Sequence, residues 1–427
     1  MNLARAVALI AVIGVLTGCG PQPSADPTQA GIPEEILEQA CTDAVSGIVD
    51  AVAELAAGYE PDAAGEPPTT PDDGGPEAED EDPLTAAVTD ARRARDRLNC
   101  DREAFAAELA DGLGAIAPST PVAEAVWRRA SASILGTVEQ EAGERALTPT
   151  DDLRDALARS AEGTTIVLPP GTIDLDSTLV LLTAVTLRGS DLDATVLRTR
   201  ATDAAVIVAT GGLVRLENLT LELVGDDPAS GLVAGPSASV ALSNVRIAGA
   251  RADEGGAGGA GVYMSAQGDE GSGRGTTLEV TDSVFARNGW AGVAVAGGHR
   301  VSIEGSTFAD NGEVGLLFLD EAGGSVGSSS FRDNRVGLAA TGSADPSWAD
   351  NAISGGDVGV QVDADAAPAI DGLRVSGTSS AAVIFGGSSG GFLGDATCAA
   401  SPYGIVISDA AAPTLGANEC QLARGGS

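Results

Sequence analysis

Apolar residues recur at a fixed long interval in the C-terminal two-thirds of the chain. Phe285, Phe308 and Phe331 follow one another at a step of 23 residues, and an asparagine and a glycine keep nearly the same step behind them. The asparagines are Asn288, Asn311 and Asn334, and the glycines are Gly292, Gly315 and Gly337. A fixed period of this size is typical of stacked structural units, each of which buries its apolar face against the next. The pattern therefore predicts a solenoid.

Two apolar columns run through ten repeats, at steps of 34, 26 and 38 residues over the first three intervals and of 22 or 23 residues after them. One column contains the phenylalanines, and the other stands five residues earlier in each repeat. The first consists of Leu187, Leu221, Ile247, Phe285, Phe308, Phe331, Ile353, Val375, Cys398 and Cys420. The second consists of Leu182, Leu216, Leu242, Val280, Ile303, Val326, Trp348, Ile370, Leu393 and Leu415. We predict that both columns form the inward wall of the coils. The asparagines would satisfy backbone groups in turns, and the glycines would allow tight bends.

Residues 33–147 show helical spacing instead, which predicts a small antiparallel helical bundle. Thr120 followed by Pro121 is typical of a helix N-cap with proline at the first helical position. Residues 60–83 contain ten acidic residues, six prolines and no basic residue, so we expect a disordered, solvated loop. An acidic calcium-binding loop is the alternative, but the prolines interrupt any regular spacing of ligands.

The N-terminus has the form of an export signal. Arg5 precedes an apolar run that is too short for a membrane span and ends in Leu16-Thr17-Gly18-Cys19. Small residues directly before Cys19 resemble a bacterial lipobox, which implies removal of residues 1–18 and a lipid on Cys19. Residues 19–32 would then form a proline-rich tether. Because Gly20 replaces the aspartate of an inner-membrane retention signal, the expected location is the cell envelope, with the outer membrane favoured in a two-membrane bacterium.

Composition excludes several classes of function. The formal net charge is −37, all 24 basic residues are arginine, and His299 is the one histidine. A chain with so large a negative charge is not expected to bind nucleic acid, because such binding depends on basic residues. Without lysine there is no Schiff base, and one histidine cannot supply a two-histidine metal site. We therefore predict no cofactor and no metal site, with Ca²⁺ as the cation left open.

The cysteines predict two disulfides. With Cys19 assigned to lipid, an even number remains, and in an exported protein these are expected to pair. Cys41 with Cys100 would join two helices across the acidic loop. Cys398 and Cys420 share a column on consecutive coils. Adjacent strands lie about 4.7–4.9 Å apart, which suits the roughly 4.4–6.8 Å Cα separation of a disulfide.

The entry to the repeats resembles a known family. Leu168-Pro169-Pro170-Gly171-Thr172, followed by Val185-Thr186-Leu187-Arg188-Gly189, is similar to the first coil of pectin-lyase-like right-handed parallel β-helices. The resemblance implies a right-handed parallel β-helix of about ten coils over residues 148–427, with a short helix at 153–161 capping the first coil. The predicted fold is therefore mainly β, a right-handed parallel β-helix preceded by a small α-helical bundle.

The irregular stretch between Ile247 and Phe285 contains the candidate binding residues. Its glycine-rich acidic loops would project from a rigid scaffold, a common place for binding residues. The ligand-binding candidates are Asp253, Glu254, Tyr263, Asp269 and Glu270, with Trp290 as a sugar-stacking surface. The alternative interpretation is a solvated insertion without a ligand, and the sequence favours it.

Arg287, Asp310 and Asp333 share one turn register and are the weak catalytic candidates. Two carboxylates about 5 Å apart can act as acid and nucleophile in a glycosidase, although Arg287, Arg332 and Arg335 would neutralise this pair. The motifs of polygalacturonases, alginate epimerases and pectate lyases are absent.

Whether the chain is an enzyme therefore stays open, and the sequence favours a non-catalytic scaffold. Such a scaffold would be anchored to the membrane through Cys19 and would bind a polysaccharide or an envelope protein. The alternatives are a polysaccharide lyase or glycoside hydrolase acting in a groove on the β-helix, and a purely structural envelope protein.

Overall fold

The structure, a computed structural model, describes residues 34–59, 83–200, 205–235, 237–254, 258–264 and 276–424. The chain divides into a helical unit, which runs to Ala142 and includes Asp151–Glu162, and a solenoid unit of Gly143–Thr150 and Gly163–Ser427. This interleaved division differs from the expected boundary between residues 147 and 148. Strand β1 (Glu144–Ala146) pairs with β2 (Thr165–Val167) in the solenoid, whereas helix α6 (Leu153–Arg159) belongs to the helical unit.

The helical unit contains four longer helices in its described part. They are α2 (Glu34–Ala57), α3 (Pro83–Leu98), α4 (Arg102–Gly114) and α5 (Pro121–Ile134). Asp101 caps α4 by accepting a hydrogen bond from the Ala104 N–H at 2.8 Å. Thr120 caps α5 in the same way through the Ala123 N–H at 3.1 Å, with Pro121 at the first helical position. The start of α5 is therefore where the sequence predicts it.

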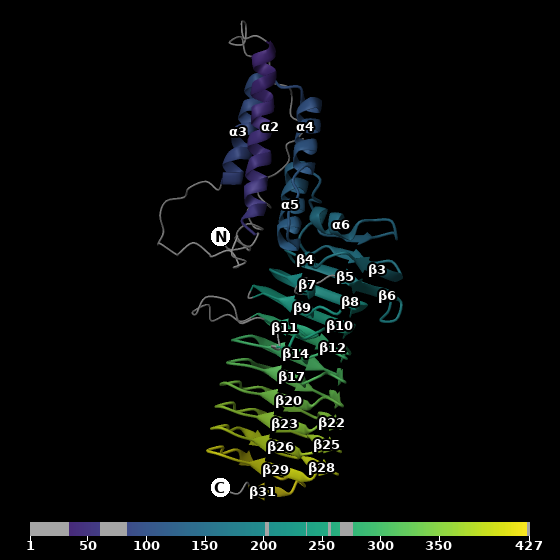
Figure 1. The fold of residues 1–427 in the computed structure, drawn as a ribbon, viewed down its shortest axis with the longest axis vertical. Coiled ribbons are helices and arrows are strands. Elements are labelled where there is room, and N and C mark those ends of the chain that lie inside the picture. Colours follow the sequence, from purple (N-terminus) through teal and green to yellow (C-terminus); the bar gives the residue numbers. More distant parts are fainter. Residues whose placement is uncertain are drawn as a thin grey trace. The chain divides into compact units, whose positions relative to one another are not determined.

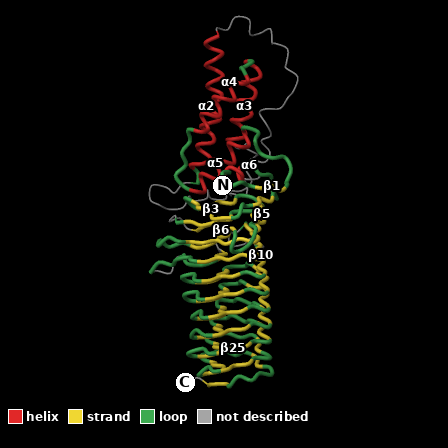
Figure 2. Tube along the Cα trace, turned by 90° about the vertical axis from the view of Figure 1, so that its right-hand side faces the viewer, coloured by secondary structure: helices red, strands yellow, loops and turns green. Residues whose placement is uncertain are grey.

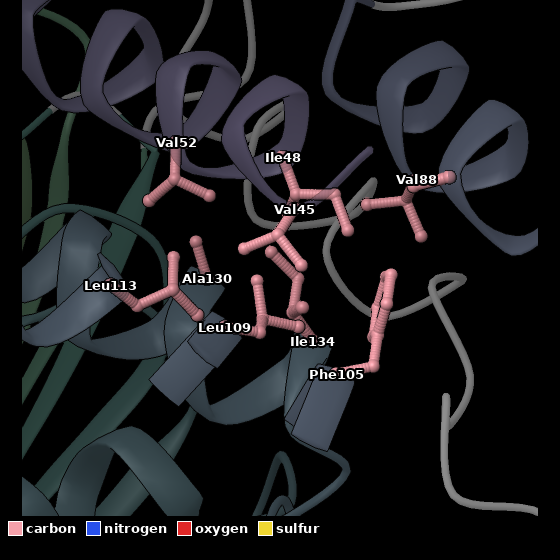
Figure 3. Packing of buried hydrophobic residues seen from close by; sticks show 10 residues of the cluster. Val45, Ile48, Val52, Val88, Phe105, Leu109, Leu113, Ala130 and Ile134 are labelled. Carbon is pink, nitrogen blue, oxygen red and sulfur yellow. The ribbon is translucent and has the colours of Figure 1, made fainter. Parts of the chain in front are cut away.

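Apolar residues from α2, α3, α4 and α5 point toward one another in a single core (Figure 3). The labelled members are Val45, Ile48, Val52, Val88, Phe105, Leu109, Leu113, Ala130 and Ile134. Within α5, the buried Arg129 donates hydrogen bonds to the carbonyl oxygens of Ala158 and Ser160. Burial lowers the pKa of the Arg129 guanidinium, and these carbonyls compensate part of the cost of burying it.

Cys41 and Cys100 form a disulfide with a Cα separation of 6.0 Å, as the sequence predicts. It joins α2 to the residue that follows the last turn of α3. The expected signal peptide, the lipid site at Cys19 and the tether lie outside the described residues, as does the acidic loop apart from Pro83. Among the helices that the structure does describe, none is long and apolar enough to cross a membrane.

In its described residues the solenoid unit forms two parallel sheets, whose strands stack coil upon coil (Figures 1 and 2). The eleven-stranded sheet consists of β4 (Leu179–Leu181), β7 (Ala205–Ala209), β9 (Ser230–Ala234), β11 (Val262–Met264), β14 (Ala291–Val295), β17 (Val314–Phe318), β20 (Val336–Ala340), β23 (Val358–Val362), β26 (Ala381–Phe385), β29 (Tyr403–Ile407) and β31 (Leu422–Arg424). With one of these strands per coil, the solenoid has about eleven turns rather than about ten. The predicted fold class is otherwise confirmed.

The twenty-stranded sheet contributes up to two strands to each coil. Besides β1 and β2 it contains β3 (Gly171–Leu175), β5 (Val185–Arg188), β6 (Thr195–Thr199), β8 (Gly212–Leu223), β10 (Ala238–Ala248), β12 (Thr277–Thr281), β13 (Val284–Ala286), β15 (Arg300–Glu304), β16 (Thr307–Ala309), β18 (Gly323–Gly327), β19 (Ser330–Arg332), β21 (Ser347–Ala349), β22 (Ala352–Ser354), β24 (Ala369–Asp371), β25 (Arg374–Ser376), β27 (Phe392–Leu393), β28 (Thr397–Ala399) and β30 (Thr414–Leu415).

The predicted register is wrong in the first coils. Leu187 pairs with Leu216, so it belongs to the second column, and Leu197 occupies the first column opposite Leu221. Leu182 lies outside both columns, directly after β4 of the other sheet. The cause is β6, an additional strand within the 34 residues that separate Leu187 from Leu221. From Leu216 and Leu221 onward, the pairing follows the predicted columns.

The phenylalanine column is a buried stack. Phe285, Phe308 and Phe331 are all 0% exposed. Their ring centroids lie 5.0 and 4.7 Å apart, with interplanar angles of 16° and 6°. Because parallel in-register strands repeat about every 4.8 Å, identical residues on successive coils place their rings face over face. The stack therefore follows directly from the constant step.

The glycine column serves close packing rather than bending, which corrects the sequence-based interpretation. Gly315 lies inside β17, and a Cβ built on it would lie 2.6 Å from the Gly337 carbonyl oxygen and 2.7 Å from Cδ1 of Phe331. The left-handed corners fall elsewhere, at Arg287, Asp310 and Asp333, whose φ angles are 56°, 55° and 53°. Glycine is thus required at this column because the phenylalanine stack occupies the space of a side chain.

Replacing Gly315 with alanine is expected to lower the free energy of unfolding by about 1–3 kcal/mol, because the added methyl group overpacks the stack. Gly298 provides the control, because a Cβ there would meet no atom within 4 Å. Chemical denaturation followed by circular dichroism measures both variants. Equal transitions for Gly315→Ala and Gly298→Ala would show that Gly315 is not sterically constrained.

The asparagine column is a buried hydrogen-bonded ladder. Oδ1 of Asn311 accepts from both the backbone N–H of Asn288, at 3.2 Å, and its Nδ2, at 3.0 Å. Oδ1 of Asn334 accepts from the same two groups of Asn311, at 3.1 and 2.9 Å. In return, Nδ2 of Asn311 donates to the Phe285 carbonyl oxygen at 3.1 Å. The predicted role of this column in satisfying backbone groups is visible in these contacts.

A second ladder, which the sequence-based reasoning missed, runs along the corner between the two strands that each coil contributes to the twenty-stranded sheet. The Ser283 N–H donates to Ser306 Oγ, the Ser306 N–H to Ser329 Oγ, and the Ser329 N–H to Asn351 Oδ1. The serines repeat at the same step of 23 residues as the phenylalanines. That common step was the signal available in the sequence.

The second predicted disulfide is also present. Cys398 and Cys420 are bonded, with a Cα separation of 5.0 Å. Cys398 pairs in register with Val375 on the preceding coil. The bond therefore joins consecutive coils through one column, as the sequence predicts.

Candidate functional site

Strands β14, β17, β20, β23, β26 and β29 share one pattern of side-chain directions. In β17, Leu316 and Phe318 are fully buried in the interior, whereas Leu317 between them faces outward and is partly exposed. The glycine at the second position of these strands, such as Gly315, faces the phenylalanine stack. The first residues of β14, β17, β20 and β23 pack with the fourth residues in one cluster, but the first residue is buried in every one of these strands except β29.

The fourth positions are partly exposed except in β14, and together with the mostly buried first positions they form two neighbouring columns along the solenoid, which we call the apolar face. The fourth positions are Tyr263, Ala294, Leu317, Ala339, Gln361, Ile384 and Val406, each paired in register with the next. The first positions are Ala291, Val314, Val336, Val358, Ala381 and Tyr403. Most of these side chains pack into one apolar cluster. All of these side chains are apolar or aromatic except that of Gln361, which carries an amide group.

The outside of the other sheet has the opposite character. Strands β12 and β15 alternate strictly between buried and exposed residues. The exposed ones are Thr277, Glu279, Thr281, Arg300, Ser302 and Glu304. A one-sided sheet ordinarily presents polar residues to water, as this one does. The apolar face therefore departs from the usual pattern, and contiguous apolar surface on a soluble protein commonly marks an interaction site.

Two of the predicted ligand-binding residues meet on this face. The rings of Tyr263 and Trp290 are 6.4 Å apart and inclined at 62°, edge against face. Both are partly buried and pack against the apolar cluster. The Trp290 N–H donates to the Gly259 carbonyl oxygen at 2.9 Å, which fixes this residue next to the preceding coil. The sequence named both aromatic residues, but only the pairing of β11 with β14 brings them together.

Asp253 and Glu254 directly follow two residues that form isolated antiparallel bridges, Arg251 with Ala229 and Ala252 with Gly258. Both acidic side chains are exposed. Asp269 and Glu270, the remaining predicted ligand-binding residues, lie outside the described residues. Across the described ranges, no three His, Cys, Asp or Glu residues form a group that could hold a metal ion.

Arg287, Asp310 and Asp333 occupy equivalent corners of three consecutive coils, as their common register implies. All three side chains are exposed. The Asp310 N–H donates to the Arg332 carbonyl oxygen at 3.0 Å, and the Asp333 N–H to that of Ser354 at 3.0 Å. Aspartate tolerates the left-handed conformation better than most residues, which accounts for its presence at these corners. The expected neutralising partner Arg335 instead pairs with Glu313.

Substituting Asp310 and Asp333 with asparagine tests this structural interpretation. Asparagine keeps the preference for a left-handed corner and removes the charge, so thermal unfolding of the double variant is expected to match the wild type within about 0.5 kcal/mol. Hydrolysis or elimination of any polysaccharide by the wild type that disappears in the double variant would contradict it.

Ion pairs elsewhere on the solenoid join strands of neighbouring coils. Arg198 donates to both carboxylate oxygens of Asp174 at 2.7 and 3.1 Å, and this bond lowers the pKa of the Asp174 carboxyl. The pair joins β3 to β6 on the surface. His299 is structural as well, because it is buried and its Nδ1 accepts a hydrogen bond from the Thr276 N–H at 3.1 Å.

The sequence of these coils matches a known family. The family described as the right-handed β-helix region matches residues 204–357 and 260–422, which together include more than half of the chain. The chain belongs to this right-handed β-helix family. The predicted right-handed parallel β-helix fold is thereby confirmed. No curated protein matches the β-helix chain by sequence.

Solved structures with a similar fold come from several classes of protein. ORF18 of Geobacillus virus E2 is 12% identical with a TM-score of 0.46, and the match covers 62% of the β-helix chain and 55% of the viral protein. The catalytic domain of a GH87 α-1,3-glucanase in complex with nigerose is 10% identical with a TM-score of 0.39, covering 66% and 70%. The A-module of mannuronan C-5 epimerase AlgE6 from Azotobacter vinelandii is 15% identical with a TM-score of 0.33, covering 60% and 91%. These similarities concern the β-helical fold alone.

The apolar face of the β-helix was not predicted from the sequence. Apolar residues do recur at the fourth strand position, and Ala294, Leu317 and Ala339 follow the phenylalanines by nine, nine and eight residues. A column of this kind is indistinguishable in sequence from an inward column. Only the direction of the side chains identifies it as surface.

Proposed function

We propose that this β-helix protein is a non-catalytic scaffold of the cell envelope that binds a partner protein through its apolar face. The observation that carries the proposal is the apolar face, whose fourth positions are partly exposed on the successive coils from β17 to β29 and apolar at all but Gln361. A partner that covers this face would remove apolar surface from water, the main favourable term in most protein association.

The character of the face favours a protein over a polysaccharide. Sugar sites combine aromatic platforms with several hydrogen-bonding side chains, whereas the partly exposed fourth positions of β17, β20 and β26 are Leu317, Ala339 and Ile384. The pair of Tyr263 and Trp290 is the one feature of the face that suits a sugar ring. A glycan that binds at this pair is therefore the second candidate, and loss of binding in Trp290→Ala would identify it.

The anchor belongs to the same proposal and rests on the sequence around Cys19. Lipid attached to this residue would hold the protein on a membrane without a spanning helix. Mass spectrometry of the N-terminal peptide tests it directly. Cys19→Ser is expected to move the protein from the membrane fraction to the soluble fraction.

Photo-crosslinking tests the binding face. A photoreactive phenylalanine analogue at Leu317, on the apolar face, is expected to give a discrete cross-linked product in cells that produce the protein. The same analogue at Ser302, exposed on the other sheet, is the matched control. Identical products from both positions, or none from Leu317, would contradict the proposed face.

The enzymatic alternative has its own test. The purified protein is incubated with polyuronates and neutral glycans, with and without Ca²⁺, and the products are followed by reducing-end and unsaturation assays. We expect no turnover, because the exposed corner carboxylates lack the enclosed surroundings that prepare an acid and a nucleophile. Turnover of any glycan would replace the scaffold proposal with an enzyme.

A further inference from the structure

Carboxylates line one border of the apolar face. They lie at the corner that follows the strands of the eleven-stranded sheet, and all of them are exposed. The residues are Asp320 and Glu321 after β17, Asp363 and Asp365 after β23, and Asp409 after β29. The corner after β20 carries Gly342 and one exposed carboxylate, Asp345, which pairs with Arg300 at 3.1 Å, and the corner after β26 carries Gly387. Apart from this ion-paired carboxylate, the acidic groups of these corners recur on alternate coils.

The backbone holds these carboxylates in place. Asp320 Oδ2 accepts from the Gly297 N–H at 3.4 Å, and Asp363 Oδ1 accepts from the Ala364 N–H at 2.7 Å. Asp409 Oδ2 accepts from the Gly387 N–H at 3.4 Å. Two of these bonds reach the preceding coil, so three of the five carboxylates have a backbone contact at the corner.

The spacing of both features matches an α-helix laid along the solenoid. Successive coils are about 4.8 Å apart, close to the roughly 5.4 Å pitch of an α-helix. Alternate coils are about 9.6 Å apart, and seven helical residues advance about 10.5 Å. Across the coils from β17 to β29 the mismatch stays within the reach of a flexible basic side chain. Small residues such as Ala339 and Ala381 allow close approach of a helix backbone.

We propose that the partner segment is an amphipathic α-helix with an apolar stripe and one basic border. This rests on the proposed function, because it names the partner that would cover the same face. The apolar stripe of the helix lies on Leu317, Ala339 and Ile384. Its basic residues, spaced by seven, pair with the groups at Asp320, Asp363 and Asp409. A net charge of −37 on the chain adds long-range attraction for a basic partner and repels an acidic one.

Three synthetic peptides test the proposal by fluorescence anisotropy against the full-length protein. The first is a helix of three heptads with a leucine stripe and lysines along one border. The second replaces the leucines with serine at the same charge, and the third replaces the lysines with glutamate. We expect the first to bind at least about tenfold more tightly than either control, and to weaken as salt screens the acidic border.

Variants of the protein test whether the peptide binds at the apolar face. Leu317→Glu and Ile384→Glu are each expected to weaken the first peptide by about tenfold or more. Ser302→Glu, which adds the same charge to the other sheet, is expected to change it little. Circular dichroism confirms that the variants fold, and because Leu317 and Ile384 point outward both should do so.

The outcomes distinguish failure of the helical-partner proposal from failure of the proposed binding face. Equal binding of the serine peptide would show simple charge attraction and would overturn the helix proposal, as would Leu317→Glu without effect. Failure of all three peptides together with a cross-link from Leu317 in cells would remove the helical partner and leave the binding face standing. Failure of both experiments would remove both.

Discussion

Phe308→Ala is expected to lower the free energy of unfolding of the solenoid by about 3–5 kcal/mol, the usual cost of truncating a buried aromatic residue. Phe308 is 0% exposed and stands between Phe285 and Phe331, so the substitution breaks two ring contacts at once. The cavity would open in the middle of a continuous stack, where the coils on both sides prevent collapse. Urea denaturation followed by far-ultraviolet circular dichroism measures the loss.

Two controls accompany this substitution. Phe308→Leu keeps most of the volume and is expected to cost less than about 1.5 kcal/mol. Phe392→Ala truncates a phenylalanine that is 41% exposed on β27, so its effect should be small. If Phe308→Ala were no more harmful than Phe392→Ala, the phenylalanine stack would not contribute to stability as the structure implies.

Asn311→Ala should have an effect of similar size through hydrogen bonds rather than packing. The substitution removes three hydrogen bonds to buried groups, namely those to the backbone N–H and Nδ2 of Asn288 and to the carbonyl oxygen of Phe285. Nδ2 of Asn288 keeps its bond to the Ile247 carbonyl oxygen at 3.3 Å. At about 1 kcal/mol for each lost hydrogen bond, a total of about 3 kcal/mol is expected. The same denaturation experiment measures it.

Asn311→Asp distinguishes hydrogen bonding from shape. Aspartate is nearly isosteric, but its second oxygen would face the Phe285 carbonyl oxygen and Oδ1 of Asn334, both acceptors. We therefore expect it to destabilise at least as much as alanine. Asn418→Ala is the control, because Asn418 is only partly buried and donates to the Gly416 carbonyl oxygen two residues away. A well-tolerated Asn311→Asp would contradict the ladder.

Asp310 and Asp333 show that residue type alone does not distinguish a catalytic role from a structural one. Asp310 and Asp333 were weighed as a catalytic pair because their register places them on adjacent coils, and the structure keeps that register. Their left-handed φ angles and exposure supply a structural reason for aspartate at these positions. Conformational preference at a corner and chemistry in a groove select the same residue type, so sequence alone does not separate them.

The repeat, the inward columns from Leu216 and Leu221 onward, the asparagine ladder and both disulfide pairs could be predicted from the order of residues alone. These features depend on a nearly constant step, because stacking identical coils converts sequence position directly into spatial position. Tertiary structure decided the rest. It revealed β6 within the first long step, the packing role of Gly315, and the outward direction of Leu317, Ala339 and Ile384. An apolar residue indicates that its position is buried in some state of the protein. Only the path of the backbone shows whether the side chain faces the core of its own chain or a surface that a partner would cover.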